Sequence, residues 1–278
     1  MNTLPKDRIA RIVIYVFLIA LCVSFIFPFF WMVSTSLKSP NEILTWPPTF
    51  WPAKLNWKNY RDVLTQINIG QMYFNSIYIA VVTTVGQVFF SALAGFAFAR
   101  MRFKGRNLLF ICYVGTMMVP SMVTLIPRYV IMSKLGWVNT HISVIAPVLL
   151  GTPFAVFLMR QFFMTLPQQL MDAAVIDGAS YPRVFFQIYL PLTRPILSTL
   201  GIFCFMGSWN DFLWPLITLQ SHNLKTLPIG LAAFQGLYGV QYNLLMAGAV
   251  LSVIPVLIVF IFAQKQFIEG IAITGLKG

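Results

Sequence analysis

Residues 160–195 read RQFFMTLPQQLMDAAVIDGASYPRVFFQIYLPLTRP, and this mixed segment separates two long apolar stretches. Its local pattern predicts two short helices with a break between them. Thr165 is a candidate N-cap of the first helix, and Pro167 suits the first turn. Gly178 can adopt the left-handed conformation that ends a helix.

A second short helix is predicted to begin near Ser180, with Pro182 early in it, and to stop at Leu190-Pro191. Its apolar residues have helical spacing, which predicts one buried face, and they are Val184, Phe185, Ile188 and Tyr189. We expect Asp172 and Asp177 near the exposed side. The pattern of Gly and Pro alone would also fit an ordinary surface hairpin of two helices.

The composition around this segment is that of a membrane protein. Of 278 residues, 58% are hydrophobic and 9% are charged, whereas about 25% are charged in a typical soluble domain. The apolar residues lie in long blocks that hydrocarbon tolerates. The net charge of +12 is interpreted as positive-inside bias, because the basic residues lie between the apolar blocks, and not as a sign of nucleic-acid binding.

The apolar blocks predict an all-α integral membrane fold of about six transmembrane helices. The block Ile12–Val33 is longer than the apolar part of a signal peptide, so we expect a retained first span. Pro147, Gly151 and Pro153 predict a bend in the fourth span. The six expected spans are Ile12–Val33, Asn75–Ala99, Leu108–Ile126, Ile142–Phe163, Pro195–Leu219 and Leu244–Ala263.

The basic residues predict cytoplasmic N- and C-termini. Lys6, Arg8 and Arg11 precede the first span, and four further basic residues lie in the link at 100–106. This link follows the second span, so it lies on the same side of the membrane as the N-terminus. The segments expected from this topology are a cytoplasmic N-terminus (1–11), a first span with a Trp/Pro-rich outer loop (12–74), a core of five spans (75–263) that contains the loop 164–194, and a cytoplasmic tail (264–278).

Cysteine and histidine residues indicate neither a disulfide framework nor a metal site. Cys22, Cys112 and Cys204 lie inside apolar segments, and His141 and His222 stand alone. No pairing of a nucleophile with a base is evident, so we do not expect an enzyme.

The segment at 172–195 carries the pattern DAAxxDGAxxxxxFxxIxLPLxxP, which resembles the cytoplasmic EAA loop of binding-protein-dependent ABC importer permeases. The topology agrees, since the segment lies on the inner side between the fourth and fifth spans. The matching positions are Asp172, Ala173, Ala174, Asp177, Gly178, Ala179, Phe185, Ile188, Leu190, Pro191, Leu192 and Pro195.

This resemblance implies the type I ABC importer permease fold, with a coupling helix between spans 4 and 5 that inserts into an ATPase subunit. The implied coupling residues are Asp172, Ala173, Ala174, Asp177, Gly178 and Ala179. The leading residue of the family motif is usually Glu, and Asp172 keeps its charge on a side chain one methylene shorter.

Two further stretches resemble the smaller, maltose-permease-like subunits of carbohydrate importers. One is SWNDFLWPL at 208–216, and the other is the C-terminal GIAITGLKG. The second resemblance implies contact with the ATPase by the last four residues, which are Gly275, Leu276, Lys277 and Gly278.

Trp209, Asn210 and Asp211 are candidate residues of a substrate path. Asp211 is the one acid inside an expected span, and a carboxylate there needs a cavity or a partner. Aromatic faces and polar groups suit a sugar, but a hydrogen bond to a partner helix fits equally well.

The sequence lacks the G-x-x-x-x-G-K-[ST] phosphate loop, so we expect this chain to bind no cofactor and to rely on ATP and Mg²⁺ held by a cytoplasmic ABC ATPase dimer. The resemblance further implies a second, homologous permease subunit, an external solute-binding protein and a place in the bacterial inner membrane. A mono- or oligosaccharide is the expected substrate. Alternatives are glycerol-3-phosphate or a polyol, and an ion-coupled secondary transporter. A phosphate ligand should need basic residues along the path, and those nearest the outer membrane boundary are Arg128 and Lys134.

Overall fold

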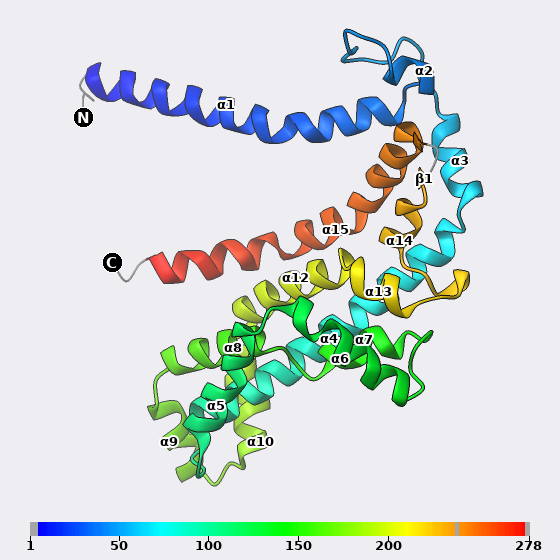
Figure 1. The fold of residues 1–278 in the computed structure, drawn as a ribbon. Helices are drawn as coiled ribbons and strands as arrows, with labels where there is room; N and C mark the ends of the chain where they lie inside the picture. Colours follow the sequence, from blue (N-terminus) through cyan, green and yellow to red (C-terminus); the bar gives the residue numbers. More distant parts are fainter. Residues whose placement is uncertain (1–4, 237–238, 276–278) are drawn as a thin grey trace. The chain divides into compact units, whose positions relative to one another are not determined.

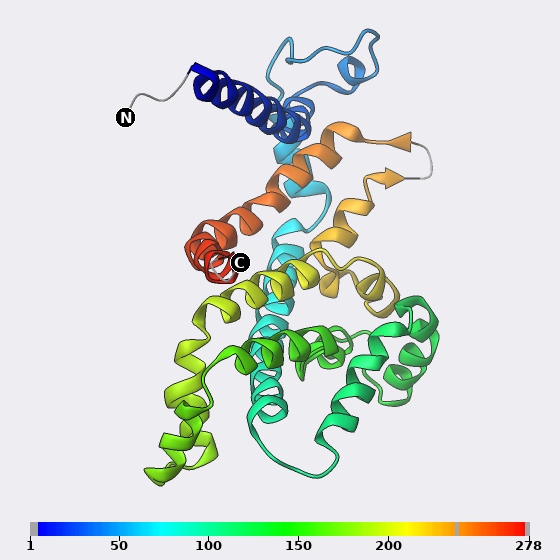
Figure 2. The ribbon, with the colours of Figure 1, turned by 90° about the vertical axis from the view of Figure 1, so that its left-hand side faces the viewer.

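The computed structural model describes residues 5–236 and 239–275 and is almost entirely helical (Figures 1 and 2). Contacts within the chain divide it into two compact units. The first unit comprises residues 1–69 and 230–254, and the second comprises residues 70–229 and 255–278.

The first unit contains one long apolar helix, short helices after it and a small hairpin of two antiparallel strands. Helix α15 begins in this unit and continues in the second. The elements are α1 (Pro5–Ser36), α2 (Pro40–Ile43), α3 (Lys58–Gln66), β1 (Gln235–Gly236), β2 (Gly239–Val240) and α15 (Tyr242–Gly275).

Asn59 on α3 fastens the first unit together. Its Nδ2 donates to the carbonyl oxygens of Ser36 and Lys38, each at 2.8 Å, and its Oδ1 accepts from Nδ2 of Asn243 at 2.9 Å. The side chain is 2% exposed. The end of α1 and the start of α15 are therefore both held by one buried amide.

The second unit contains the helix-rich core of the chain and the segment quoted first above. Its long helix α4 is followed by shorter helices and turns (Figure 1). They are α4 (Ile69–Arg100), α5 (Arg106–Gly115), η1 (Thr116–Met118), α6 (Ser121–Lys134), α7 (Ile142–Leu149), α8 (Pro153–Thr165), α9 (Gln169–Ile176), α10 (Tyr181–Val184), the π-helical turn η2 (Phe185–Tyr189), α11 (Leu190–Leu192), α12 (Arg194–Trp209), α13 (Leu213–Thr218), η3 (His222–Leu224) and α14 (Leu227–Ala232).

Four helical stretches of the described residues are individually long and apolar enough to cross a membrane, and two bent helix pairs would raise the number to six. The single stretches are Arg8–Ser36, Ile69–Arg100, Ile142–Thr165 and Tyr242–Phe262. This agrees with the expected count of about six spans.

The third span differs from its expected form. In place of one helix over Leu108–Ile126, the chain forms Arg106–Met118 and Ser121–Lys134, which meet at 104°. Val119 is extended, with ψ of 118°, because it precedes Pro120, and a residue before proline is driven out of the helical region. The break carries the apolar segment on to Lys134 and brings Arg128 into a helix.

The fourth span is interrupted, as predicted from its prolines. Gly151 lies between α7 and α8 with φ of +100°, and a Cβ there would come within 2.7 Å of Oγ of Ser91. Helix α8 then begins with Pro153 in its first turn, and Thr152 accepts a hydrogen bond from the amide of Ala155 at 3.4 Å. Thr152 and Pro153 thus suit the first turn of α8, where backbone N–H groups lack partners within the helix.

Helix α4 packs closely on α8. A Cβ at Gly95 would lie 2.7 Å from Cβ of Met159 and 2.9 Å from the amide nitrogen of Arg160. Small residues allow such approach between membrane helices. Phe96, Phe163, Phe185 and Tyr189 continue this contact into a buried aromatic cluster at one end of the unit.

Candidate coupling site and membrane cavity

The first arm of the 160–195 segment ends as the sequence predicts. Helix α9 stops at Ile176, and Gly178 has φ of +74°. The amide of Gly178 donates to the carbonyl of Val175 at 3.0 Å, and that of Ala179 donates to Ala174 at 2.9 Å. This pair of bonds is the Schellman arrangement, which needs a residue tolerant of positive φ at the glycine position.

The prediction for the beginning of α9 is wrong. Thr165 ends α8, and its Oγ1 donates to the carbonyl of Phe162 at 2.8 Å instead of capping the next helix. Leu166 is extended because it precedes Pro167, so that proline lies before α9 and outside its first turn. Gln168 is the residue that precedes α9.

The second arm confirms the predicted start and buried face. Ser180 is extended before α10, and Pro182 lies in its first turn. Val184, Phe185 and Tyr189 are fully buried, and Ile188 packs against the same cluster. The arm is therefore held by its apolar face against the second unit.

The coupling hairpin, defined as residues 169–189, lies at one end of the second unit (Figures 1 and 2). Its tip is apolar and exposed. Val175 is 52% exposed and Ile176 is 84% exposed, while Ala174 on the opposite face is buried. Asp172 and Asp177 are exposed, as expected. Ala173 and Gly178 are also exposed, and Ala179 is half-buried. Neighbouring apolar residues left in the open are typical of a docking surface.

Arg100, the last residue of α4, joins this hairpin to the membrane helices. Its guanidinium donates to the carbonyl oxygens of Phe163 and Leu166, both at 2.5 Å, and to Oε1 of Gln168 at 2.6 Å. The two carbonyls lie at the C-terminal end of α8, where a cation satisfies groups that lack a partner in the helix.

The contacts of Arg100 extend into both arms of the hairpin. Gln168, which accepts from Arg100, donates in turn to Oδ1 of Asp172 in the first arm at 3.2 Å. The guanidinium of Arg100 also lies 5.3 Å from the ring centre of Tyr189. One side chain thus ties α4 to α8 and to both arms.

From the sequence, Arg100 was interpreted only as part of the positive-inside pattern, and its bridging role was missed. The available signal was its position as the last residue of an apolar span, directly before the inner boundary.

The fifth span is also broken, which corrects the expectation of one helix over Pro195–Leu219. Helix α12 ends at Trp209, and the backbone is not helical again until Leu213 begins α13. Asp211 therefore lies in a break between helices and not inside a helix. The amide of Trp214 donates to the Asp211 carboxylate from the first turn of α13.

The three candidate path residues occupy different surroundings. Trp209 is 3% exposed and packs between the rings of Tyr73 and Phe205, with ring centres 5.7 and 5.9 Å away. Asn210 is exposed and donates to the carbonyl of Met206 at 2.9 Å. Asp211 faces a cavity. The structure does not bring the three side chains together in one lining.

This cavity has a volume of about 270 Å³ and lies entirely within the second unit. It combines apolar walls with polar side chains from α4, α6 and α12 and from the breaks at Thr152 and Asp211. The polar residues in its lining are Thr83, Gln87, Arg128, Thr152, Ser208 and Asp211.

Arg128 is the one cation in this lining. Its guanidinium lies 3.9 Å from the ring centre of Trp214, and the Trp214 Nε1 is fixed by donating to the carbonyl of Ser143 at 2.9 Å. The buried Nε of Arg128 has no hydrogen-bond acceptor among the described residues. Asp211 is near enough to attract the guanidinium electrostatically.

Residues 87–272 match the family of binding-protein-dependent transport system inner membrane components. This chain belongs to that family. It is therefore a multi-pass inner-membrane permease subunit and not an enzyme, and ATP hydrolysis lies in a partner subunit.

Several curated relatives are similar to this permease over nearly its whole length. The arabinooligosaccharides transport system permease protein AraQ of Halalkalibacterium halodurans is 39% identical, with 91% of each chain covered. The lactose transport system permease protein LacG of Rhizobium radiobacter is 34% identical, with 97% of this chain and 98% of the relative covered. The trehalose/maltose transport system permease protein MalG of Thermococcus litoralis is 33% identical, with 98% and 99% covered.

A solved structure confirms the type I ABC importer permease fold. A chain of a bacterial ABC transporter involved in the import of the acidic polysaccharide alginate matches with a TM-score of 0.82 and 24% identity. The match covers 96% of this permease and 99% of that chain. At this identity the likeness concerns the fold.

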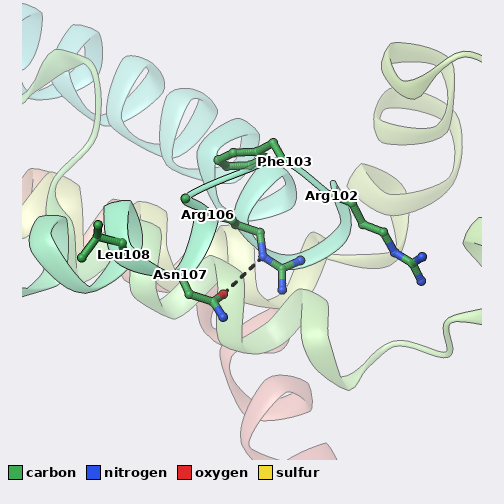
Figure 3. A pocket seen from close by; sticks show the side chains of 6 residues that line it. Arg102, Phe103, Arg106, Asn107 and Leu108 are labelled. Carbon is green, nitrogen blue, oxygen red and sulfur yellow. Dashed lines mark hydrogen bonds between the residues drawn. The ribbon is translucent and has the colours of Figure 1, made fainter.

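The loop between α4 and α5 of the permease is basic and open. Arg102, Arg106 and Asn107 line a hollow of about 460 Å³ (Figure 3). Arg106 donates to Oδ1 of Asn107 at 3.4 Å and to the carbonyl of Met101 at 3.1 Å, while Arg102 extends away from the loop. Unlike Arg100, the exposed Arg102 does not join the hairpin contacts.

The predicted tail contact falls mostly outside the described residues. Gly275 is the last residue of α15, and Leu276, Lys277 and Gly278 lie beyond the part that the structure describes. Within the described residues, no group of three or more His, Cys, Asp and Glu side chains could hold a metal ion, and the three cysteines are unpaired.

Proposed function

We propose that this permease forms, with a second homologous permease, the membrane path of an ATP-driven importer for an uncharged mono- or oligosaccharide. An external solute-binding protein delivers the sugar, and a cytoplasmic ABC ATPase dimer supplies the energy. The relatives named for arabinooligosaccharide, lactose and trehalose/maltose transport support a sugar as the substrate class.

The coupling hairpin is the observation that carries this proposal. Its exposed tip at Val175 and Ile176 offers an apolar surface to an ATPase subunit. Its base is held by Arg100 and by the aromatic cluster around Tyr189. A push on the tip therefore reaches α4 and α8 without a flexible joint between them.

The mechanism follows from this connection. When the ATPase subunits close on nucleotide, the hairpin moves with them, and α4, α8 and α12 follow as a packed group. A rigid-body movement of this kind exposes a membrane cavity alternately to the two sides. In this topology the N- and C-termini and the hairpin are cytoplasmic, and the Trp/Pro-rich loop lies outside.

The cavity at Asp211 fits the proposed sugar path. It offers both hydrogen-bond donors and acceptors, as hydroxyl groups require, next to apolar walls. Arg128 is the observation that favours glycerol-3-phosphate as the alternative substrate, since a phosphate needs a cation. Asp211 offsets that charge, so an uncharged sugar is the better fit.

Site-directed cross-linking tests this proposal. Ile176→Cys should react with aqueous thiol reagents only from the cytoplasmic side and should cross-link to the ATPase subunit in membranes. Leu44→Cys, at an equally open position of the outer loop (80% exposed), is the matched control and should react only from outside. Labelling of Ile176→Cys from outside the cell would refute the coupling role.

A further inference from the structure

Two opposite charges line one cavity in the membrane part of this permease, and both side chains are half-buried. Arg128 comes from α6, after the break at Val119–Pro120, and Asp211 comes from the break between α12 and α13. Charged side chains at membrane depth are costly and generally mark a functional site. The pair therefore needs an explanation beyond packing.

Arg128 is held in orientation but not saturated. Its Cζ atom lies over the Trp214 ring, 3.9 Å from the ring centre, and this cation–π contact restrains the guanidinium. Its buried Nε has no acceptor among the residues that the structure describes. A guanidinium has five N–H donors in a fixed fork, and because Nε is buried, the donors that a ligand in the cavity can reach are those of the two terminal nitrogens.

Asp211 has the complementary capacity. Asp211 lies in the break between α12 and α13, and the amide of Trp214 donates to one acceptor position of its carboxylate. An ionised carboxylate has about four such positions. The same residue, Trp214, thus orients both charges, through its ring and through its backbone.

We propose that Arg128 and Asp211 form a sugar-binding subsite that selects uncharged, hydroxyl-rich ligands and rejects anionic ones. Arg128 donates to one ligand hydroxyl, and Asp211 accepts from a neighbouring hydroxyl. A ligand phosphate or carboxylate gains the attraction of Arg128 but meets the repulsion of Asp211 and must also lose its water. Rejection of this kind, by an unfavourable group placed against the wrong ligand, is a general route to specificity.

The size and the rest of the lining fit a single sugar ring. A volume of about 270 Å³ equals roughly nine water molecules in the liquid. Thr83 and Ser208 add hydroxyl groups, which are hydrogen-bonded to each other at 3.0 Å and can each bond a ligand as well. This inference rests on the proposed function, because it assigns the substrate contact of the same transport path.

A single cysteine in the cavity can report occupancy. Gly207 lines the cavity, and a Cβ there would meet nothing within 4 Å, so Gly207→Cys fits without strain. Gly201, on the same helix but outside the lining, has equally open space and provides the matched control as Gly201→Cys. Both are placed in a chain whose three native cysteines are changed to serine.

The experiment measures the rate of modification of each cysteine by methyl methanethiosulfonate in the complete transporter held with a non-hydrolysable ATP analogue. Lactose, maltose and arabinotriose are the uncharged probes, and the one that the wild-type transporter takes up is used. We expect it to slow modification of Gly207→Cys at least five-fold and to leave Gly201→Cys unchanged. Digalacturonate and glycerol-3-phosphate should not protect either position.

Charge variants complete the test. In the Gly207→Cys chain, Asp211→Asn should allow digalacturonate or glycerol-3-phosphate to protect, and Arg128→Gln should abolish protection by the uncharged sugar. Protection of the unchanged pair by an anion, or no protection by a sugar that is taken up, would overturn the subsite and leave the proposed function standing. Uptake of none of the three sugars would instead count against the proposed function.

Discussion

Arg100 and Arg128 are two arginines of the same compact unit, and the chain treats them in opposite ways. Arg100 donates to two backbone carbonyls and one side-chain oxygen, all within 2.6 Å. The buried Nε of each arginine has no acceptor in the described part of the chain, but Arg128 contacts an indole ring and lines a cavity. Arg100 stabilises the structure, whereas Arg128 keeps hydrogen-bond donors free for a ligand.

The difference corresponds to the two tasks of a transporter subunit. A mechanical connection must not yield, and the terminal nitrogens of Arg100 are accordingly bonded to three oxygen atoms of the chain. A binding cavity must exchange partners, so its polar groups are oriented but not saturated. Substitutions at the two arginines should therefore separate stability from selectivity.

The largest effect is expected for Arg100→Gln. The change removes the positive charge and at least one of the bonds to the α8 carbonyls, which should destabilise the hairpin base by about 2–3 kcal/mol. Uptake per ATP hydrolysed by the reconstituted transporter should fall at least ten-fold. Arg102→Gln, in the open loop two residues further on, is the control and should retain coupling. Equal behaviour of the two variants would contradict the proposed role of Arg100 in connecting the hairpin to α4 and α8.

A smaller effect is expected for Gly178→Val at the hairpin turn. A Cβ at this position meets nothing within 4 Å, so the cost comes from φ of +74° alone. That conformation costs a non-glycine residue about 1–2 kcal/mol, and a β-branched residue tolerates it least. Uptake per ATP hydrolysed should fall several-fold, less than in Arg100→Gln, while the ATPase activity of the complex continues. Gly178→Asn should retain more transport, since Asn tolerates positive φ, and the reverse order would contradict the cap.

Arg128→Gln should change stability little. The variant loses a stacking contact with Trp214 worth about 1 kcal/mol, and no hydrogen bond from Nε to the chain. The thermal aggregation midpoint of the purified transporter should stay within a few degrees of the unchanged protein. A drop as large as that of Arg100→Gln would show that Arg128 is structural and would remove the contrast between the two sites.

The smallest effect is expected for Tyr189→Phe. The Tyr189 hydroxyl is buried without a hydrogen-bond partner among the described residues, while the ring contacts Phe96, Phe163 and Arg100. Removing an unsatisfied hydroxyl should leave the free energy of unfolding within about 0.5 kcal/mol or raise it. The same thermal measurement and the uptake assay check this, and a clear loss would reveal a polar contact at the joint.

The membrane fold and the coupling hairpin could be predicted from the sequence because their signals are local. Apolar blocks locate the spans, and glycine at 178 marks a helix end that few other residues permit. The prediction of Thr165 as an N-cap was wrong because of the proline that follows it at position 167. Leu166 precedes Pro167, and this proline ends α8 before Thr165 could begin another helix.

The breaks in the third and fifth spans could not be predicted from residue pattern alone. Proline removes a donor at Pro120, but whether the helix kinks or breaks depends on which neighbours satisfy the freed groups. The joint at Arg100 and the cavity at Arg128 both depend on residues far apart in the chain. Arg128 fell beyond the expected span, and a span extended to Lys134 would have placed it in the membrane.

Helix α1 has few packing contacts with the rest of the described chain. None of its most apolar stretch is buried by other parts of the described structure. Its C-terminal end is held by the bond between Ser36 and Asn59 and by ring contacts with Phe50 and Trp51. Lipid or a neighbouring subunit must supply the side-chain contacts of the rest of this helix. Such a helix can enter the bilayer as soon as it is synthesised and can be exchanged for another apolar helix of similar length without any repacking of the transport machinery.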